Sequence, residues 1–192
     1  MDAVMLDRRD FVQQLLADRG DLLVVPGLGS ATYDVAAAGD HPLNFYLWGA
    51  MGGTAMIALG LALARPERRV VAIPGDGDML MGLGSLATIG VKQPKNLVVV
   101  VLDNAHYGET GMQPSHTKAG IDFAALALAC RFHHARSVTR SEETAEVRKL
   151  LHSGEGPILI NAKIKPDDVP RVLTLRDGHA IKARFIASLN AL

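Results

Sequence analysis

An unbroken apolar run, LVVVVL at residues 97–102, constrains the fold of this chain more than any other feature. A strand with one face in water alternates apolar and polar residues, whereas this run has no alternation. Such a strand must be covered on both faces, as the inner strands of parallel sheets are. We therefore expect a parallel sheet that lies between two layers of helices.

Strands and helices alternate along the rest of the chain. Apolar runs predict further strands at 22–25, 44–49, 70–73, 134–138 and 157–164. Helical patterns predict helices over 7–19, 51–64, 79–90, 122–129, 141–152 and 179–190. This alternation predicts the α/β class, a three-layer α/β/α fold with a mostly parallel central sheet. The 192 residues are expected to form one domain, 1–192, with a C-terminal tail and helix over 166–192.

Composition excludes several classes of function. Lys plus Arg and Asp plus Glu number 20 each, so no net charge attracts nucleic acid or an anionic membrane. The single cysteine, Cys130, can form no internal disulfide and cannot hold an iron–sulfur cluster. The longest apolar stretch, residues 49–64, is short for a membrane span and contains four glycines. With no apolar signal-peptide core at the N-terminus, these features favour a reduced, cytoplasmic setting.

Three loops follow predicted strand ends, at residues 26–30, 75–78 and 103–120. The carboxyl ends of parallel strands meet at one edge of the sheet, where ligands bind. In the second loop Asp76 stands between two glycines, whose backbone N–H groups can approach a phosphate. Gly-Asp-Gly is also a common turn tripeptide, so this loop alone does not decide between a turn and a site.

A second polar residue favours a binding site over a plain turn at this loop. Asn104 follows the next strand end, 28 positions after Asp76, and one strand–helix–strand unit brings both to the same edge. A carboxylate beside a phosphate is repulsive unless a cation lies between them. Carboxylate and amide oxygens suit Mg²⁺ or Ca²⁺.

The segment from Gly75 to Asn104, "GDGDMLMGLGSLATIGVKQPKNLVVVVLDN", resembles the signature of thiamine diphosphate enzymes, and the likeness extends over about residues 22–162. The resemblance implies that a large apolar residue 25 positions before the aspartate, Met51, props the cofactor into its bent shape. Gly49 would offer its carbonyl to the aminopyrimidine. The implied Mg²⁺ ligands are Asp76, Asn104 and the backbone carbonyl of His106.

The same resemblance implies a set of residues around the diphosphate, with the start of the loop beyond Asn104 also near the cofactor. Relatives often have Ser or Ala where Asp78 stands, so Asp78 either touches the diphosphate or caps the next helix. The cofactor-binding residues implied, besides Gly49, Met51 and the metal ligands, are Gly75, Gly77, Asp78, Tyr107 and Gly108.

A narrower likeness is to the small β subunits of sulfopyruvate decarboxylase and to phosphonopyruvate decarboxylases, carried by "NFYLWGAMG" and "LDNAHYGETGMQPSHT". Those families commonly show "DNG-x-YG-x-TGGQPT". Here Ala105 and Met112 replace glycines, and Glu109 stands where Ser is frequent. These changes adjoin the expected substrate pocket and leave the substrate open.

The glutamate that activates the pyrimidine ring in this family comes from a separate domain. The chain has six glutamates, none in a recognisable pyrimidine-domain context, and no room for a second domain of that kind. We expect a pyrimidine-binding α subunit to supply it, as a separate chain in a hetero-oligomer. The initiator-like Met1 supports a separately encoded subunit.

The loop beyond Asn104 holds two candidate catalytic residues, His116 and Glu109. A proton donor is needed after CO₂ leaves, and histidine suits that role near neutral pH. Solvated loop polarity is the competing interpretation for both. A carboxylate at Glu109 would repel an anionic substrate tail unless the tail lies elsewhere or the group is protonated.

The sequence thus predicts a thiamine diphosphate- and Mg²⁺-dependent decarboxylase subunit that acts without oxidation on a sulfopyruvate- or phosphonopyruvate-like 2-oxoacid. One alternative is a carboligase or acyl-transfer subunit. Another is a cofactor-binding regulatory subunit without catalysis. No pattern indicates binding to nucleic acid or membranes.

Overall fold

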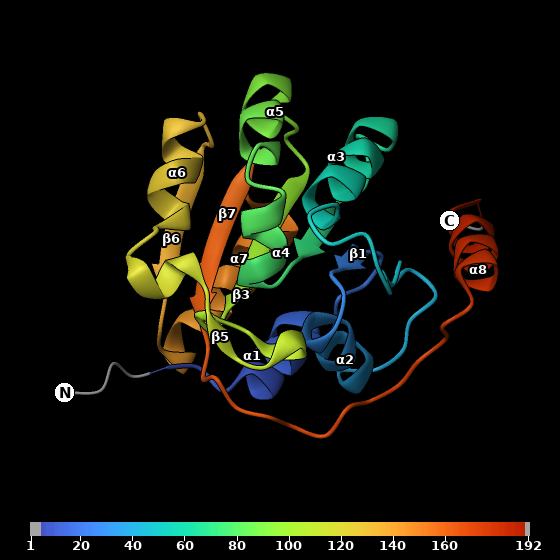
Figure 1. Ribbon diagram of the computed structural model, residues 1–192. Helices are drawn as coiled ribbons and strands as arrows, with labels where there is room; N and C mark the ends of the chain where they lie inside the picture. The colour runs from blue at the N-terminus through green and yellow to red at the C-terminus, as the bar shows by residue number, and fades with distance from the viewer. Residues whose placement is uncertain (1–4, 191–192) are drawn as a thin grey trace.

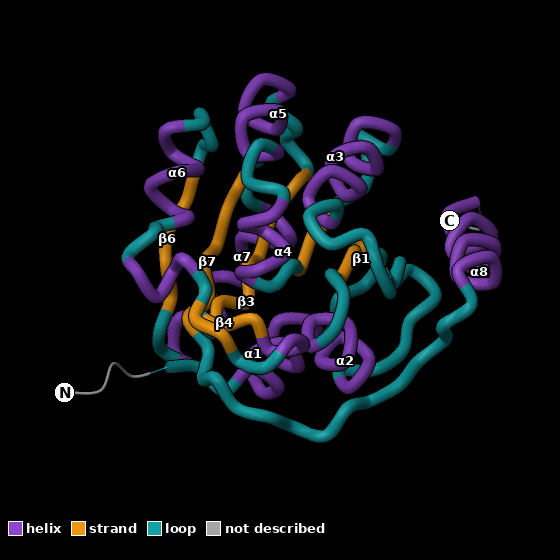
Figure 2. The backbone as a smooth tube through the Cα atoms, in the orientation of Figure 1, coloured by secondary structure: helices purple, strands orange, loops and turns teal. Residues whose placement is uncertain are grey.

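The computed structural model describes residues 5–190 and contains a five-stranded parallel sheet in the order β1-β2-β3-β7-β6 (Figures 1 and 2). Every pair of neighbouring strands in this sheet is parallel; for example, Val71 pairs with Val98 and Val100 pairs with Ile160. The strands are β1 Leu23–Pro26, β2 Val70–Ile73, β3 Leu97–Asp103, β6 His134–Val138 and β7 Ile158–Lys163. The predicted parallel sheet is therefore confirmed.

The central strand β3 has every residue buried, as its unbroken apolar sequence predicts. Successive side chains of a strand point to opposite faces. Val98 and Val100 accordingly belong to one hydrophobic cluster, and Val99 and Val101 belong to the other. Both faces of the sheet thus need a covering layer.

Helices supply both layers (Figure 1). One face is covered by α1 Arg8–Leu16, α2 Ser30–Ala37 and α7 Thr144–Ser153. The other is covered by α3 Thr54–Ala64, α4 Asp76–Met81, α5 Ser85–Lys92 and α6 Phe123–Ala129. The three-layer α/β/α prediction is confirmed. No helix among residues 5–190 has the length and apolar character that a bilayer crossing requires.

Two predicted elements differ from the structure, and one helix was not predicted. The strand expected at 44–49 is reduced to a single bridge between Asn44 and Val24, because the chain leaves the β1 edge after Phe45. The helix expected over 79–90 is two helices, α4 and α5, which meet at the glycine-rich turn 82–84. The helix α2 was not predicted at all, since its small residues give little apolar periodicity.

The loop after β3 is more ordered than its sequence indicates. It contains the two-stranded antiparallel pair β4 His106–Tyr107 and β5 Gln113–Pro114. Short 3-10 helices lie at Gly108–Thr110 and His116–Ala119, and a third, at Ser141–Glu143, precedes α7. The loop therefore has regular backbone structure beside the sheet edge.

The C-terminal tail runs past α1 and α2 before the last helix, α8 Gly178–Asn190, packs near the β1 edge (Figure 1). The ring of Phe185 lies 5.3 Å from that of Phe45, edge to face. Ion pairs fix both parts, with Arg184 at 2.7 Å from Asp40 and Arg171 at 3.4 Å from Glu109. The tail is thus attached along its length.

Candidate functional site: a pocket at the carboxyl edge of the sheet

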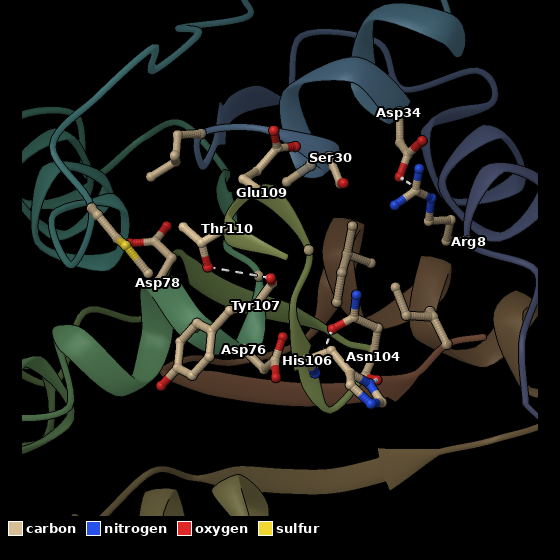
Figure 3. Close-up of a pocket in the computed structure, with 18 residues that line it drawn as sticks. Arg8, Ser30, Asp34, Asp76, Asp78, Asn104, His106, Tyr107, Glu109 and Thr110 are labelled. Atoms are coloured by element: carbon tan, nitrogen blue, oxygen red, sulfur yellow. Dashed lines mark hydrogen bonds and ion pairs between the residues drawn. The ribbon is translucent and has the colours of Figure 1, made fainter. Parts of the chain in front are cut away.

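A pocket of about 130 Å³ lies at the carboxyl edge of the sheet (Figure 3). The segments that follow β1, β2 and β3 form most of its wall, with additional side chains from α1 and α2. The prediction that these loops meet at one edge is confirmed. The predicted site residues in the wall are Met51, Gly75, Asp76, Gly77, Asp78, Asn104, His106, Tyr107, Gly108 and Glu109.

Asp76 is the first residue of α4 and is only 3% exposed. Its Oδ2 accepts a hydrogen bond of 2.5 Å from the hydroxyl of Ser115. Burial is the main cause that raises the pKa of Asp76 to about 6. Buried Asp34 and Asp103 have Arg or Lys partners, whereas Asp76 has no ion pair within residues 5–190. A buried carboxylate without a basic partner fits a bound cation.

Asn104 follows β3 directly and faces the same space as Asp76 (Figure 3). Its Oδ1 accepts a 2.9 Å hydrogen bond from the backbone N–H of His106. The ring Nδ1 of His106 lies 2.7 Å from the Asn104 carbonyl oxygen, so the turn is held from both sides. An amide oxygen has two lone pairs, so Oδ1 retains one for a metal.

Within residues 5–190, no group of three or more His, Cys, Asp or Glu side chains has the geometry of a metal centre. Zinc or a transition metal would need such a group. Mg²⁺ instead takes one or two protein oxygens together with phosphate oxygens and water. One carboxylate, one amide oxygen and a loop carbonyl therefore fit Mg²⁺ in the company of a diphosphate.

The start of α2 lies in the loop 26–30 that was expected at this edge, but no residue of that loop was predicted as a site residue. Ser30, the first residue of α2, lines the pocket and follows Gly29, whose φ is +70°. The N-terminus of a helix attracts anions through its free N–H groups and dipole. A Gly-Ser pair after a predicted strand was the available signal.

Asp78 does not cap the helix that follows it. Its carboxylate accepts hydrogen bonds from the backbone N–H of Gly52, at 2.6 Å, and from the hydroxyl of Thr54. Gly52 lies two residues before α3 and Thr54 is the first residue of that helix, so both donors precede Asp78 in the chain. Although Asp78 lines the pocket, its two oxygens are engaged in fixing the turn that carries Met51.

Met51 is 41% exposed and lines the pocket, so it is not part of the hydrophobic core. A Cβ on Gly77 would lie 2.7 Å from the Tyr107 ring and 3.3 Å from Met51 Cε. Glycine at this position therefore lets both side chains approach the backbone. Gly49 is exposed two residues before Met51 and is not part of the pocket wall.

The two candidate catalytic residues lie in different places. Glu109 lines the pocket near Ser30 and pairs with Arg171, which lies in the C-terminal tail (Figure 3). His116 instead lines an adjacent apolar pocket of about 510 Å³, with its Nδ1 at 3.4 Å from Tyr107 Oη. Met51, Gly77 and Tyr107 form a wall shared by both pockets.

Two sequence departures from the resembled families have a structural cost. Ala105 has a φ of +60° and Met112 a φ of +59°. Glycine occupies this left-handed region freely, whereas residues with a Cβ rarely do. The loop has therefore kept a backbone suited to glycine at both positions while carrying larger side chains.

A parallel sheet with a glycine-rich helix start, a buried carboxylate and an amide at one edge fits an α/β domain that would hold a diphosphate cofactor. Residues 27–162 match the family "Thiamine pyrophosphate enzyme, C-terminal TPP binding domain". The chain belongs to this thiamine pyrophosphate enzyme family.

Similar proteins include sulfopyruvate decarboxylase subunit beta of Methanothermobacter thermautotrophicus, 37% identical over 95% of each chain. Phosphonopyruvate decarboxylase of Streptomyces viridochromogenes is 37% identical over 81% of this chain and 39% of its own. The structure of thiamine diphosphate-dependent 4-hydroxybenzoylformate decarboxylase from Rhodococcus jostii superposes with a TM-score of 0.69 at 21% identity. That match covers 87% of this chain and 34% of the other.

Proposed function

We propose that this chain is the cofactor-anchoring subunit of a thiamine diphosphate-dependent 2-oxoacid decarboxylase, with sulfopyruvate- or phosphonopyruvate-like substrates. One observation carries the proposal: an acid–amide pair and two glycines at the sheet edge, in a chain that matches a decarboxylase β subunit over almost its whole length. When bound, the cofactor supplies the electron sink for the charge left as CO₂ departs.

The residues of this chain would bind and orient that cofactor. Asp76 and Asn104, with the carbonyl of His106, would hold Mg²⁺ against the diphosphate. Gly75 and Gly77 would let the backbone approach the phosphates, and Met51 would support the middle of the cofactor. His116 and Glu109 are the candidates for moving a proton near the substrate.

The activating glutamate is proposed to come from a partner chain. Of the six glutamates, only Glu109 lines the pocket, and Arg171 already pairs with its carboxylate. Relatives named as β subunits support a heteromeric enzyme with an α partner.

Reconstitution tests this function. With thiamine diphosphate, Mg²⁺ and sulfopyruvate or phosphonopyruvate, the chain alone is expected to release no CO₂ above background. Addition of a pyrimidine-domain chain should raise the rate at least ~100-fold, because proton transfer by a positioned group contributes ~10²–10⁴. A partner variant with Gln in place of its activating glutamate is the control. Turnover by the chain alone, unchanged by any partner, would contradict the proposal.

Product analysis separates the decarboxylase from the other possible outcomes. An aldehyde and CO₂ in equal amounts are expected, even when a second aldehyde is present. A carbon–carbon ligation product as the main species would indicate a carboligase instead. Cofactor binding without turnover in the presence of every pyrimidine-domain partner would indicate a regulatory subunit.

A further inference from the structure

A buried arginine of α1 lies in the cofactor pocket, outside every motif that the sequence singled out. Arg8 is the first residue of α1 and is only 4% exposed, yet its side chain lines the pocket with Asn104 and Gly108. It also lines a polar cavity that adjoins this pocket. Burial of a guanidinium group costs several kcal/mol unless partners compensate it.

The partners of Arg8 within residues 5–190 are incomplete. Its Nε lies 3.4 Å from Asp34 Oδ2 and 3.9 Å from Asp167 Oδ1, and it forms no hydrogen bond. Arg9 Nε bonds the other oxygen of Asp34 at 2.9 Å. One fully buried carboxylate therefore serves two arginines, and Asp167 is partly screened by solvent. The buried guanidinium thus has positive charge and N–H groups available for an anion.

Arg8 and Asp34 lie together at one end of the pocket, and Asp78 and Tyr107 lie toward the other (Figure 3). Ser30, at the start of α2, is near the Arg8 end, as is Asn104 (Figure 3). Met51 belongs to the opposite end, because its Cε lies close to Gly77 and to the Tyr107 region. A helix N-terminus and a buried guanidinium thus converge beyond the metal-binding residues.

We propose that Arg8 binds the terminal phosphate of the cofactor, with its planar guanidinium donating two N–H groups to the phosphate oxygens. This inference rests on the proposed function. Arginine forms such paired bonds to phosphate better than lysine does. Asp34 holds the guanidinium in place from behind. A sulfonate or phosphonate tail of the substrate has the same chemistry, but the position of Arg8, remote from Met51, favours the cofactor.

Binding measurements on the full chain test this role without any need for turnover. Titration calorimetry with saturating Mg²⁺ would compare thiamine diphosphate with thiamine monophosphate, which lacks the terminal phosphate. Arg8→Met is expected to weaken diphosphate binding about 10- to 100-fold, as for loss of a charged hydrogen bond. Monophosphate binding should change less than about threefold, a change within the context dependence of single contacts.

Arg9→Met is the matched control, because Arg9 is adjacent, shares Asp34 and does not line the pocket. It should leave both affinities within about threefold. Arg8→Lys keeps the charge but loses the planar pair of N–H donors, so its affinity for thiamine diphosphate should fall between those of the wild type and Arg8→Met. It also provides a test if the methionine variant folds poorly.

The outcomes separate this inference from the proposed function. If the wild type, Arg8→Met and Arg9→Met all bind thiamine diphosphate with equal affinity, the role of Arg8 is overturned while the proposed function stands. Equal losses for both ligands would indicate a structural role and overturn it too. Unchanged cofactor affinity with a raised KM for the anionic substrate would assign Arg8 to the substrate tail instead. A wild-type chain that binds no thiamine diphosphate would overturn the proposed function itself.

Discussion

Replacement of Asp76 with Asn is expected to abolish Mg²⁺-dependent binding of thiamine diphosphate while the fold persists. The amide keeps the size of the side chain and its contact with Ser115, but it removes the charge that would hold the cation. At 100 times its dissociation constant the cofactor should stabilise the wild type by about 2.7 kcal/mol. For a chain of this size that raises Tm by about 5–10 °C. The Asn variant should show no such shift.

The control for this variant is Asp122→Asn, because Asp122 caps α6 away from the pocket and Asn is an equally good cap. It should keep the full shift in a thermal melt with Mg²⁺ and cofactor. Retention of the shift by the Asp76 variant at normal affinity would contradict the metal assignment.

The same substitution should change how the stability of the cofactor-free chain depends on pH. The pKa of Asp76 is raised to about 6 in the folded protein, against about 3.9 for an unfolded aspartate. Between these values the folded state holds a proton that the unfolded state has lost, so stability falls as pH rises through this window. Denaturant unfolding at pH 4.5 and pH 7 should show this contribution in wild type and not in Asp76→Asn.

Gly82→Ala is expected to destabilise the chain by about 2 kcal/mol, which lowers Tm by about 4–8 °C. Gly82 ends α4, and a Cβ there would overlap the carbonyl oxygen of Gly52, a backbone atom that cannot yield easily. The displaced turn also carries Met51 and the backbone N–H of Gly52, which donates a hydrogen bond to Asp78. Cofactor affinity should therefore fall as well, although Gly82 lies outside the pocket wall.

Gly84→Ala is the matched control two residues further on. Its Cβ would meet no heavy atom within 4 Å, and its φ of −59° suits alanine. It should change the free energy of unfolding by no more than about 0.5 kcal/mol. Equal melting temperatures for the two variants, measured by circular dichroism, would show that the contact between Gly52 and Gly82 does not matter.

The sequence predicted the sheet well because unbroken apolar runs such as 97–102 have few alternatives to a buried parallel strand. It predicted the region around Asp76 and Asn104 because strand ends in such sheets converge. Local patterns were less informative for α2, whose alanines lack periodicity, and for the break at Gly82, which depends on a distant backbone contact.

The contributors to the pocket and to its buried surroundings that sequence reasoning missed come from distant elements. Arg8 belongs to the first helix, and the hydroxyls of Ser115 and Thr117 link buried Asp76 to Asp103. No local pattern marks residues that meet only through tertiary packing. The position of Asp78 against the start of α3 is a further example, because its partners precede it by more than 20 residues.

The attachment of the tail gives the chain an optical reporter of its own. Trp48 is the only tryptophan, and its indole N–H donates to the Leu175 carbonyl at 2.8 Å. The guanidinium of Arg176 lies 5.4 Å from the ring, and Met51 follows three positions later. Because the tail contacts this indole directly, the intrinsic fluorescence of Trp48 is expected to change when the tail detaches. Emission colour and intensity therefore give a measure of tail docking without an attached dye.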